Sequence, residues 1–227
     1  MFSFKLFTKF CSKEGRELFE QNKQTFFYSE GRRIFNEGEP VKGIYFVERG
    51  MVKVLSRAFD KSEKIVRLAS NQMILGHRGL NTKTYPISAE ALTETVVTFL
   101  PTQVFNNILS NNSEMAAYLI NFLSDEIRDS EKRMKNLLIP DPKIRIAIIL
   151  VKLIDDFGYN KDAGNNLLTY TLSRTDIANF CGTTYETVIR TLAHFKKNKI
   201  INLVGKEIAI ANEKKLREIA SGIEPKK

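Results

Sequence analysis

The sequence predicts an α+β protein with three parts: an N-terminal antiparallel β-roll similar to a jelly roll, a long helix, and a C-terminal winged helix-turn-helix. Three observations predict this fold. Short strand-like runs fill the stretch from about Thr25 to Pro101, the apolar period changes from two to about three and a half after Thr102, and two short helical patterns precede a hairpin signal in residues 172–210. We expect domains at residues 1–110, 111–139 and 140–227.

Composition restricts the classes of protein that need to be considered. The chain has 227 residues, of which 43% are hydrophobic, and it contains no long uncharged apolar run. The N-terminal MFSFKLFTKF has no sustained apolar core and no cleavage site, so we expect no secretion signal. Two cysteines, Cys11 and Cys181, fit a reducing compartment. We therefore expect a cytoplasmic protein without a membrane partner.

The net charge favours a polyanionic partner. The formal charge is +9 with a pI near 9.5. Residues 140–227 hold 15 basic and 10 acidic side chains, and the longer remainder holds 20 and 16. The excess is only mildly concentrated in the last third, so charge alone is weak evidence for a nucleic-acid partner.

Seven strand-like runs define the predicted β-roll. Turn signals at Glu30-Gly31, Glu37-Gly38, Arg49-Gly50 and Asp60-Lys61 separate them, and such spacing is typical of an antiparallel barrel, sandwich or jelly roll. The runs are TFFYS, RRIFN, GIYFVE, MVKVLSR, EKIVRLAS, SAEALT and TVVTFL. A short helix from Ser12 to Gln24 precedes them.

The next segment predicts a short helix, Gln103 to Leu109, and a long helix from the caps at residues 111–113 to about Leu138. A seam with coiled-coil spacing runs along the long helix. A second apolar stripe begins at Met115, so one stripe is expected to pack on the β-roll and the other on a second subunit. The alternative is a helix buried within a monomer; the acidic and basic residues of the lower half, Glu126 among them, favour the dimer. The seam consists of Ala116, Ile120, Leu123, Ile127, Ser130, Met134 and Leu137.

The C-terminal part begins with a strong helix signal. Asp141 is suited to cap a helix whose first residue is Pro142, and the helix is expected to end at Gly158. Farther on, Ser173 followed by Asp176 indicates a second N-terminus, and Gly182 is expected to end that short helix in a left-handed conformation.

A third helix restarts at Thr183 or Thr184 and buries a stripe of Val188, Leu192 and Phe195, before the hairpin signal NLVGKEIAI. Glu186 and Arg190 lie four residues apart on another face. At that spacing they are most often an ion pair on the helix surface. After a three-residue turn, however, they occupy the place where a recognition helix meets base edges, with Arg suited to guanine and Glu to cytosine. We favour DNA reading.

The order of β-roll, long helix and winged helix resembles the Crp/Fnr family of bacterial transcription regulators over essentially the whole chain. The resemblance rests on GEPVKGIYFVERGMVKV, DPKIRIAIILVKL and TTYETVIRTLAHFKKNKIINLVGKEIAI. It implies a cyclic-nucleotide-binding-like domain, a homodimer on a palindromic site of double-stranded DNA, and RNA polymerase as a further partner.

The resemblance also assigns DNA contacts. Glu186 and Arg190 match the two base-reading positions, and Tyr185 and Ile189 stand where relatives carry other residues, so a relative's operator is not transferred. Further groups are expected to contact the DNA backbone, which positions a protein without reading sequence. They are Ser173, Arg174, Thr175, Thr183, Thr184 and Lys206.

In the loop that resembles the family's effector site, the chain departs from the pattern. Cyclic-nucleotide-binding members have a Gly-Glu-Leu step and an Arg-Ser or Arg-Thr pair, where this chain has His77 and Pro86-Ile87. The effector is therefore expected not to be cyclic AMP. The candidate effector residues are Gly76, His77, Arg78, Lys83 and Ser88.

No resident cofactor or metal is expected. Two cysteines cannot supply the four thiolates of an iron–sulfur cluster. A haem ligand at His77 is a weaker interpretation than a hydrogen-bonding histidine. His194 fits a phosphate contact and core packing equally well, and Cys181 fits packing.

No catalytic motif is present, so an enzyme is the poorest hypothesis. The sequence predicts a sequence-specific transcription regulator with an unknown effector. The alternatives are a cyclic-nucleotide-responsive regulator of the same architecture and a β-roll interaction module that does not bind DNA, which would require Glu186 and Arg190 to be incidental.

Overall fold

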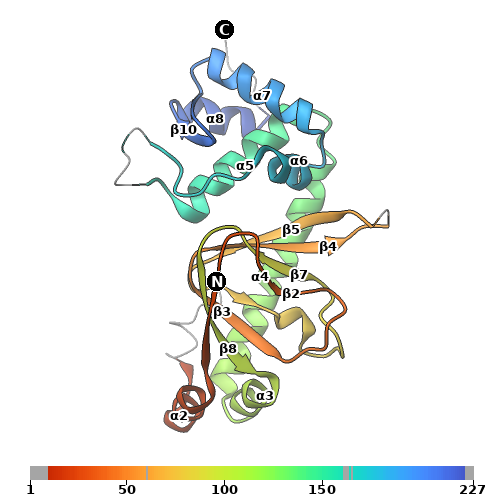
Figure 1. Ribbon diagram of the computed structural model, residues 1–227, viewed down its shortest axis with the longest axis vertical. Helices are drawn as coiled ribbons and strands as arrows, with labels where there is room; N and C mark the ends of the chain where they lie inside the picture. Colours follow the sequence, from red (N-terminus) through yellow and green to blue (C-terminus); the bar gives the residue numbers. More distant parts are fainter. Residues whose placement is uncertain (1–9, 60, 161–163, 165, 223–227) are drawn as a thin grey trace. The chain divides into compact units, whose positions relative to one another are not determined.

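The computed structural model describes residues 10–59, 61–160, 164 and 166–222. The chain divides into two compact units, Met1–Asp129 and Ser130–Lys227, and the boundary falls inside one long helix (Figure 1). Two predictions concern residues outside this set: the absence of a secretion signal at the N-terminus and the turn at Asp60.

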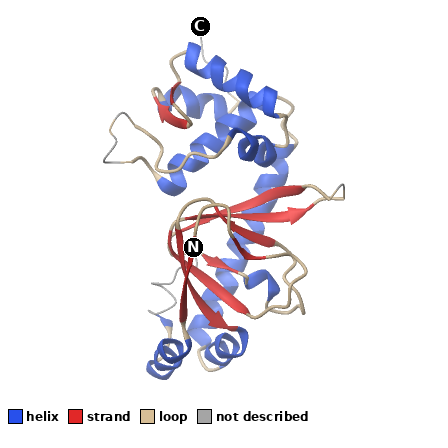
Figure 2. Ribbon diagram, viewed as in Figure 1, coloured by secondary structure: helices blue, strands red, loops and turns tan. Residues whose placement is uncertain are grey.

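The first unit contains two four-stranded antiparallel sheets, shown as red arrows in Figure 2. One sheet has the order β1-β8-β3-β6 and the other the order β2-β7-β4-β5. The strands are β1 (Gln24–Tyr28), β2 (Arg33–Phe35), β3 (Gly43–Arg49), β4 (Met51–Arg57), β5 (Glu63–Ser70), β6 (Ile74–Leu75), β7 (Ser88–Ala91) and β8 (Thr95–Pro101). All seven predicted runs form strands, which confirms the antiparallel β-roll.

Alternation along β3 creates two cores. Tyr45 and Val47 pack in one apolar cluster with residues of β2, β4 and β7, between the sheets. Ile44 and Phe46 point to the opposite face and pack with the helices. Because successive strand residues face opposite sides of a sheet, a run that is apolar at every position indicates a strand covered on both faces.

Three helices cover the outer face of the first sheet. They are α2 (Lys13–Asn22), α3 (Thr102–Ser110) and α4 (Ser113–Leu137). Ser12 caps α2 by accepting a hydrogen bond from Gly15 N at 3.1 Å. On α4 the buried residues are Met115, Leu119 and Phe122, so the stripe that packs on the β-roll is the second one.

Two short elements of this unit were not predicted, β6 and the 3-10 helix η1 (His77–Gly79). Gly76 precedes η1 with φ 80°, and a side chain there would lie 3.0 Å from the carbonyl oxygen of Gly43. Both the left-handed backbone and the close approach therefore favour glycine.

The second unit contains four helices and a hairpin, β9 (Ile201–Val204) with β10 (Glu207–Ile210). The helices are α5 (Pro142–Phe157), α6 (Arg174–Cys181), α7 (Tyr185–Lys197) and α8 (Glu213–Ala220). Asp141 caps α5, and its side chain accepts from Lys143 N at 2.8 Å. This arrangement confirms the predicted winged helix-turn-helix.

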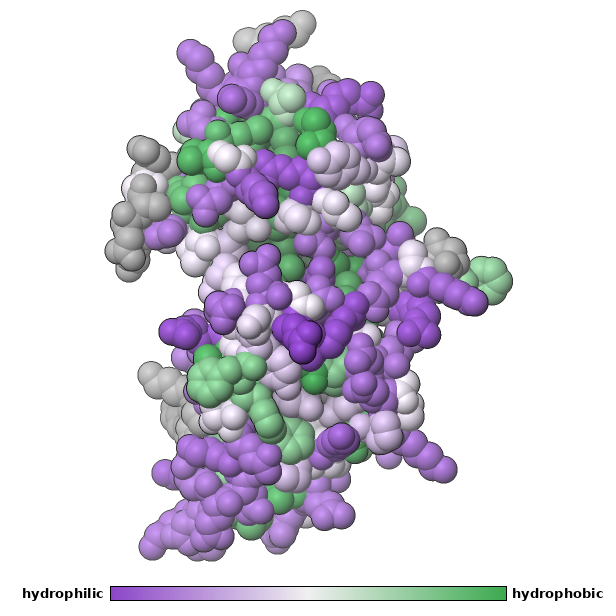
Figure 3. All heavy atoms as spheres, in the orientation of Figure 1, coloured by the Kyte–Doolittle hydropathy of each residue, from purple (hydrophilic) through white to green (hydrophobic). Residues whose placement is uncertain are grey.

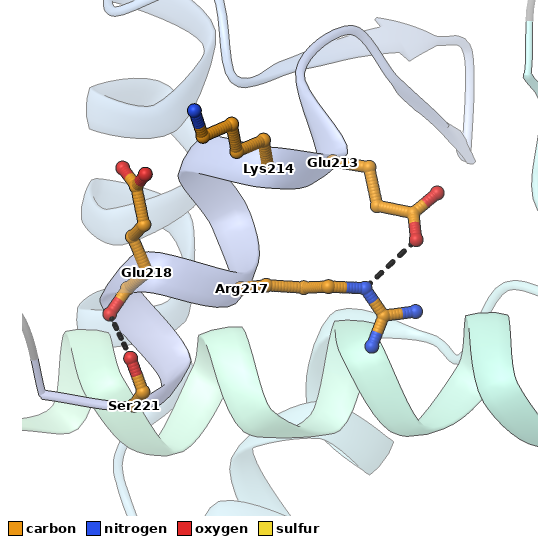
Figure 4. Close-up of a pocket in the computed structure, with 5 residues that line it drawn as sticks. All are labelled: Glu213, Lys214, Arg217, Glu218 and Ser221. Atoms are coloured by element: carbon orange, nitrogen blue, oxygen red, sulfur yellow. Dashed lines mark hydrogen bonds and ion pairs between the residues drawn. The ribbon is translucent and has the colours of Figure 1, made fainter.

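The sequence analysis did not predict α8. Its Leu216 is buried, and its Arg217 bonds Glu213 on the same helix and Asp155 on α5, at 2.8 and 2.6 Å. Figure 4 shows Arg217 and Glu213 beside a shallow hollow on this helix, lined also by Lys214, Glu218 and Ser221. These contacts attach α8 to α5.

Across the described part of the chain, none of the helices combines the length and the apolar character needed to cross a membrane. Figure 3 shows hydrophilic residues over much of the visible surface of each unit, interspersed with smaller apolar patches.

Candidate nucleic-acid interface

The geometry of the turn between α6 and α7 follows from three local signals. The Ser173 hydroxyl caps α6 by accepting from Asp176 N at 3.0 Å and donates to Asp176 Oδ2 at 2.7 Å. Gly182 ends α6 with φ 59° and ψ 47°, the left-handed conformation expected from the sequence. Thr184, one of the two caps considered, begins α7 and accepts from Thr187 N at 3.2 Å.

The recognition-helix candidate α7 has one buried and one exposed face. Val188, Leu192 and Phe195 are buried, as predicted. At the N-terminal end, the four predicted base-reading residues lie together on the exposed face. They are Tyr185, Glu186, Ile189 and Arg190.

Large apolar surface on this face is unusual for a helix that meets only water. Tyr185 keeps 51% and Ile189 43% of their surface exposed. No ion pair joins Glu186 to Arg190 among those formed by the described residues. The alternative of an ion pair on the helix surface therefore has no support in this structure.

The groups expected at the DNA backbone differ in how available they are. Thr175 is exposed, Thr183 is half-buried, and the hydroxyls of Ser173 and Thr184 serve as helix caps. Arg174 does not extend freely into solvent, because its guanidinium donates to the carbonyl oxygen of Lys206. This contact links the start of α6 to the wing.

Lys206 lies at the tip of the wing. Gly205, with φ 59°, and Lys206 form the two-residue turn between Val204 and Glu207, which pair across the hairpin. The Lys206 side chain is exposed. Its position agrees with the expected phosphate contact, and that role stays a prediction.

Arg145 on α5 contacts the backbone of the helix-turn-helix and of the segment that precedes α5. Its Nη1 donates to the carbonyl oxygen of Ile139 at 2.7 Å, and its Nη2 lies 3.4 Å from the carbonyl oxygen of Gly182. Gly182 itself approaches Leu137, since a Cβ there would lie 3.2 Å from Leu137 Cδ2. The turn at Gly182 is thus packed against residues 137–139, which precede α5.

Two lone residues now have definite surroundings. His194 is exposed on α7, which excludes the core-packing interpretation and leaves the phosphate contact as a prediction. Cys181 is buried, as predicted for a packing residue, and burial raises the pKa of its thiol to about 12.

The predicted effector loop does not form one cluster. His77 and Arg78 in η1 approach α4, whereas Lys83 is exposed. Ser88 lies in β7, where its hydroxyl accepts a hydrogen bond from Glu37 N at 2.9 Å. Among the described residues, no group of three or more His, Cys, Asp or Glu side chains is arranged to hold a metal ion.

Glu126 on α4 differs from the sequence expectation of a solvated residue. Its side chain is only 14% exposed, and its Oε1 lies 3.0 Å from Nε of Arg67 on β5. Its Oε2 lies 3.4 Å from Nη2 of Arg78 and 3.8 Å from Nε2 of His77. Burial alone would raise the pKa of Glu126, but His77 and the two guanidinium groups lower it to about 2.

Sequence reasoning missed Arg67 entirely. A signal for Glu126 was present, because the buried stripe Met115, Leu119 and Phe122 reaches position 126 at its next step of four residues. An acidic residue on an apolar stripe requires a buried partner.

The predicted seam of α4 is largely exposed in the single chain. Ile127 keeps 61% of its surface exposed, and Ala116 and Ser130 are half-buried. The other exposed seam residues are Ile120, Leu123, Met134 and Leu137. The alternative of a helix buried within a monomer therefore has no support in the single chain, and a second subunit stays a prediction.

Comparison with known families decides the identity. A model of the cyclic nucleotide-binding domain matches residues 25–112, and one of the Crp-like helix-turn-helix domain matches residues 144–219. The chain belongs to the Crp/Fnr family of transcription regulators. It is a DNA-binding transcription regulator, and the family is not one of enzymes.

Among the relatives of this Crp/Fnr regulator, the transcriptional activator protein anr of Pseudomonas aeruginosa is 30% identical over 85% of the chain and 79% of its own length. A CRP-like cAMP-activated global transcriptional regulator of Mycobacterium tuberculosis is 26% identical over 83% and 84%. The structure of FixK2 from Bradyrhizobium japonicum has a TM-score of 0.77 at 23% identity and covers 87% of this chain and 96% of that one. This structural likeness supports the same fold.

Proposed function

We propose that this regulator binds a palindromic operator as a homodimer and reads bases with α7. The observation that carries the proposal is the exposed face at the start of α7, where Glu186 and Arg190 stand beside exposed Tyr185 and Ile189. A two-fold dimer with one recognition helix per subunit requires half-sites about one helical turn, 34–36 Å, apart. The half-site is expected to contain a G·C base pair.

The base assignment follows from donor and acceptor patterns. Arg190 is expected to donate to guanine O6 and N7, and Glu186 to accept from cytosine N4. Arg190→Ala should weaken binding by about 1–3 kcal/mol per half-site and relax the preference at one base.

Selection from randomised DNA followed by a gel shift tests the assignment, with Lys206→Ala as the matched control. Because we propose that Lys206 contacts phosphate, its replacement should weaken binding to all sequences and reduce the salt dependence. Equal losses by Arg190→Ala on operator and random DNA would assign Arg190 to phosphate instead. An interaction module that does not bind DNA would select no motif.

Dimer formation is proposed through the α4 seam. Ile127→Asp places one acid per subunit on an exposed apolar stripe, so two like charges would meet at the axis. Light scattering should find monomers, with weak operator binding. Asn121→Asp, an exposed change outside the seam, is the control and should remain dimeric. A monomeric wild type at micromolar concentration would refute the dimer.

Cyclic AMP is not the proposed effector. The residues that resemble the nucleotide site do not converge: Lys83 is exposed, Ser88 bonds Glu37, and His77 and Arg78 approach Glu126. Isothermal titration should show no micromolar binding of cyclic AMP. Binding in that range would favour the second candidate, a cyclic-nucleotide-responsive regulator, which the match to the nucleotide-binding domain supports.

The proposed compartment is the cytoplasm, with RNA polymerase as a further partner.

A further inference from the structure

Three basic side chains of the β-roll meet the carboxylate of Glu126. Arg67 comes from β5, His77 and Arg78 come from η1, and Glu126 comes from α4. Arg67 also donates from Nη1 to the carbonyl oxygen of Ile74 at 2.9 Å, so its guanidinium is fixed between β6 and α4. The cluster therefore joins elements of both sheets to the long helix.

The chemistry of this cluster is that of an anion-binding site. Arg67 and Arg78 carry positive charge, and Arg67 is only 6% exposed. Buried charges of one sign are costly unless an opposite charge meets them, and guanidinium groups are matched in geometry to carboxylates. The two oxygens of Glu126 are approached separately, Oε1 by Arg67 at 3.0 Å and Oε2 by Arg78 at 3.4 Å.

His77 gives a second, independent indication of a site. Its side chain is 2% exposed, and neither ring nitrogen has a hydrogen-bond partner. Nε2 is directed to Glu126 Oε2 but stays 3.8 Å away, and the ring packs edge-on against Phe122 with 5.1 Å between centroids. Buried polar groups normally have a hydrogen-bond partner. The unpaired His77 imidazole could therefore donate a hydrogen bond to an anion, and the Glu126 carboxylate is too far away to accept it.

We propose that Arg67, His77 and Arg78 form an anion-binding site of the β-roll, and that its ligand is the carboxylate of the chain's own Glu126. The ligand class is a small carboxylate. Because the ligand belongs to α4, occupying the site attaches the long helix to the β-roll. An external anion must displace Glu126 before it can reach Arg67, whereas the Arg78 side chain is 28% exposed.

This inference affects the proposed function. If Glu126 fills the site, α4 is held to the β-roll without any added small molecule. Operator binding by the wild type should then need no effector. That consequence rests on the proposed function; the binding site itself does not.

The test is to empty the site and refill it. In the full-length chain, Glu126→Ala removes the internal ligand and leaves space for formate or acetate. We expect the melting temperature to fall by about 6–12 °C, because removing one partner of a buried ion pair leaves unpaired charge. Added formate should restore at least about a third of the loss in a saturable manner, whereas chloride at equal ionic strength should not.

The controls separate binding from general salt effects. Formate should not stabilise the wild type, whose site is filled, or Asp129→Ala, which removes an exposed acid on the same helix. Formate stabilising Glu126→Ala no more than chloride does would overturn the proposal.

Two further variants decide the question if Glu126→Ala does not fold. Glu126→Gln keeps the size of the side chain without its charge, and Glu126→Asp keeps the charge with one methylene fewer. If the carboxylate is a ligand, Asp retains more stability than Gln; the opposite order would mean that the side chain acts by packing and would overturn the proposal.

Operator binding supplies a separate measurement. Formate should strengthen the operator binding of Glu126→Ala at least about threefold and leave the wild type unchanged. If the wild type binds no operator while formate still stabilises Glu126→Ala, the proposed function fails and the anion site stands.

Discussion

Acid should weaken the first unit through one carboxylate whose contribution is calculable. Glu126 has its pKa lowered from 4.5 to about 2 by groups that it meets only in the folded chain. A folded pKa below the unfolded value stabilises the protein above the unfolded pKa, and this stability is lost as pH falls through the folded pKa. The shift of about 2.5 units corresponds to roughly 3 kcal/mol at neutral pH. About 2 kcal/mol of this disappears between about pH 6 and pH 3.

Urea unfolding of the wild type and of Glu126→Gln, measured across this range, tests the effect. Other carboxylates with lowered pKa values, such as Glu14, Glu39 and Glu213, titrate in both proteins and cancel in the difference. The stability difference between the two proteins should shrink by about 2 kcal/mol on acidification. A difference that stays constant from about pH 6 to pH 3 would show that Glu126 is not ionised in a basic environment, and the reasoning would be refuted.

Three other outcomes are expected. Burial, followed by the charges of the neighbouring arginines, lowers the pKa of His77 although Glu126 opposes the shift; the unfolded chain therefore binds more protons, and stability should fall as pH drops below about 6.5. In His77→Phe this loss should be absent from urea unfolding, and an unchanged slope would contradict the assignment. Leu192→Ala should destabilise the protein by about 2–5 kcal/mol in the same assay, because this side chain on the inner face of α7 is almost fully buried; a cost under about 1 kcal/mol would indicate a collapsible core. Arg174→Met removes the bond to the carbonyl oxygen of Lys206, so amide hydrogen exchange should accelerate in the wing turn while α7 stays protected; unchanged wing exchange would show that the contact does not hold the turn.

The sequence indicated most of the fold because its local signals are chemical and short-ranged. Ser173, Asp141 and Gly182 act within four residues of their position, as a cap or a left-handed stop, and the structure places each as expected. The apolar period then decided which face of α7 is buried. Such signals need no knowledge of the tertiary structure.

What the sequence did not indicate depends on distant partners. Strand β6 has two residues, too few for a period, and α8 is short and held by Arg217 reaching Asp155 62 residues away. Glu126 was expected in solvent because its partner on β5, Arg67, is remote in sequence. Ser88, likewise, was placed in the effector loop because its hydrogen-bond partner, Glu37, is remote in sequence.

The buried thiols have a consequence for redox chemistry. Burial raises the pKa of Cys181 to about 12 and likewise raises the pKa of Cys11, so both thiols stay protonated at neutral pH. Oxidants and alkylating reagents attack the thiolate, so both native sulfurs should be nearly silent in the folded chain. A single cysteine introduced on an exposed face would be the one reactive position. The wild-type sequence therefore serves directly as a background for site-specific fluorescent labelling of α4 or the wing.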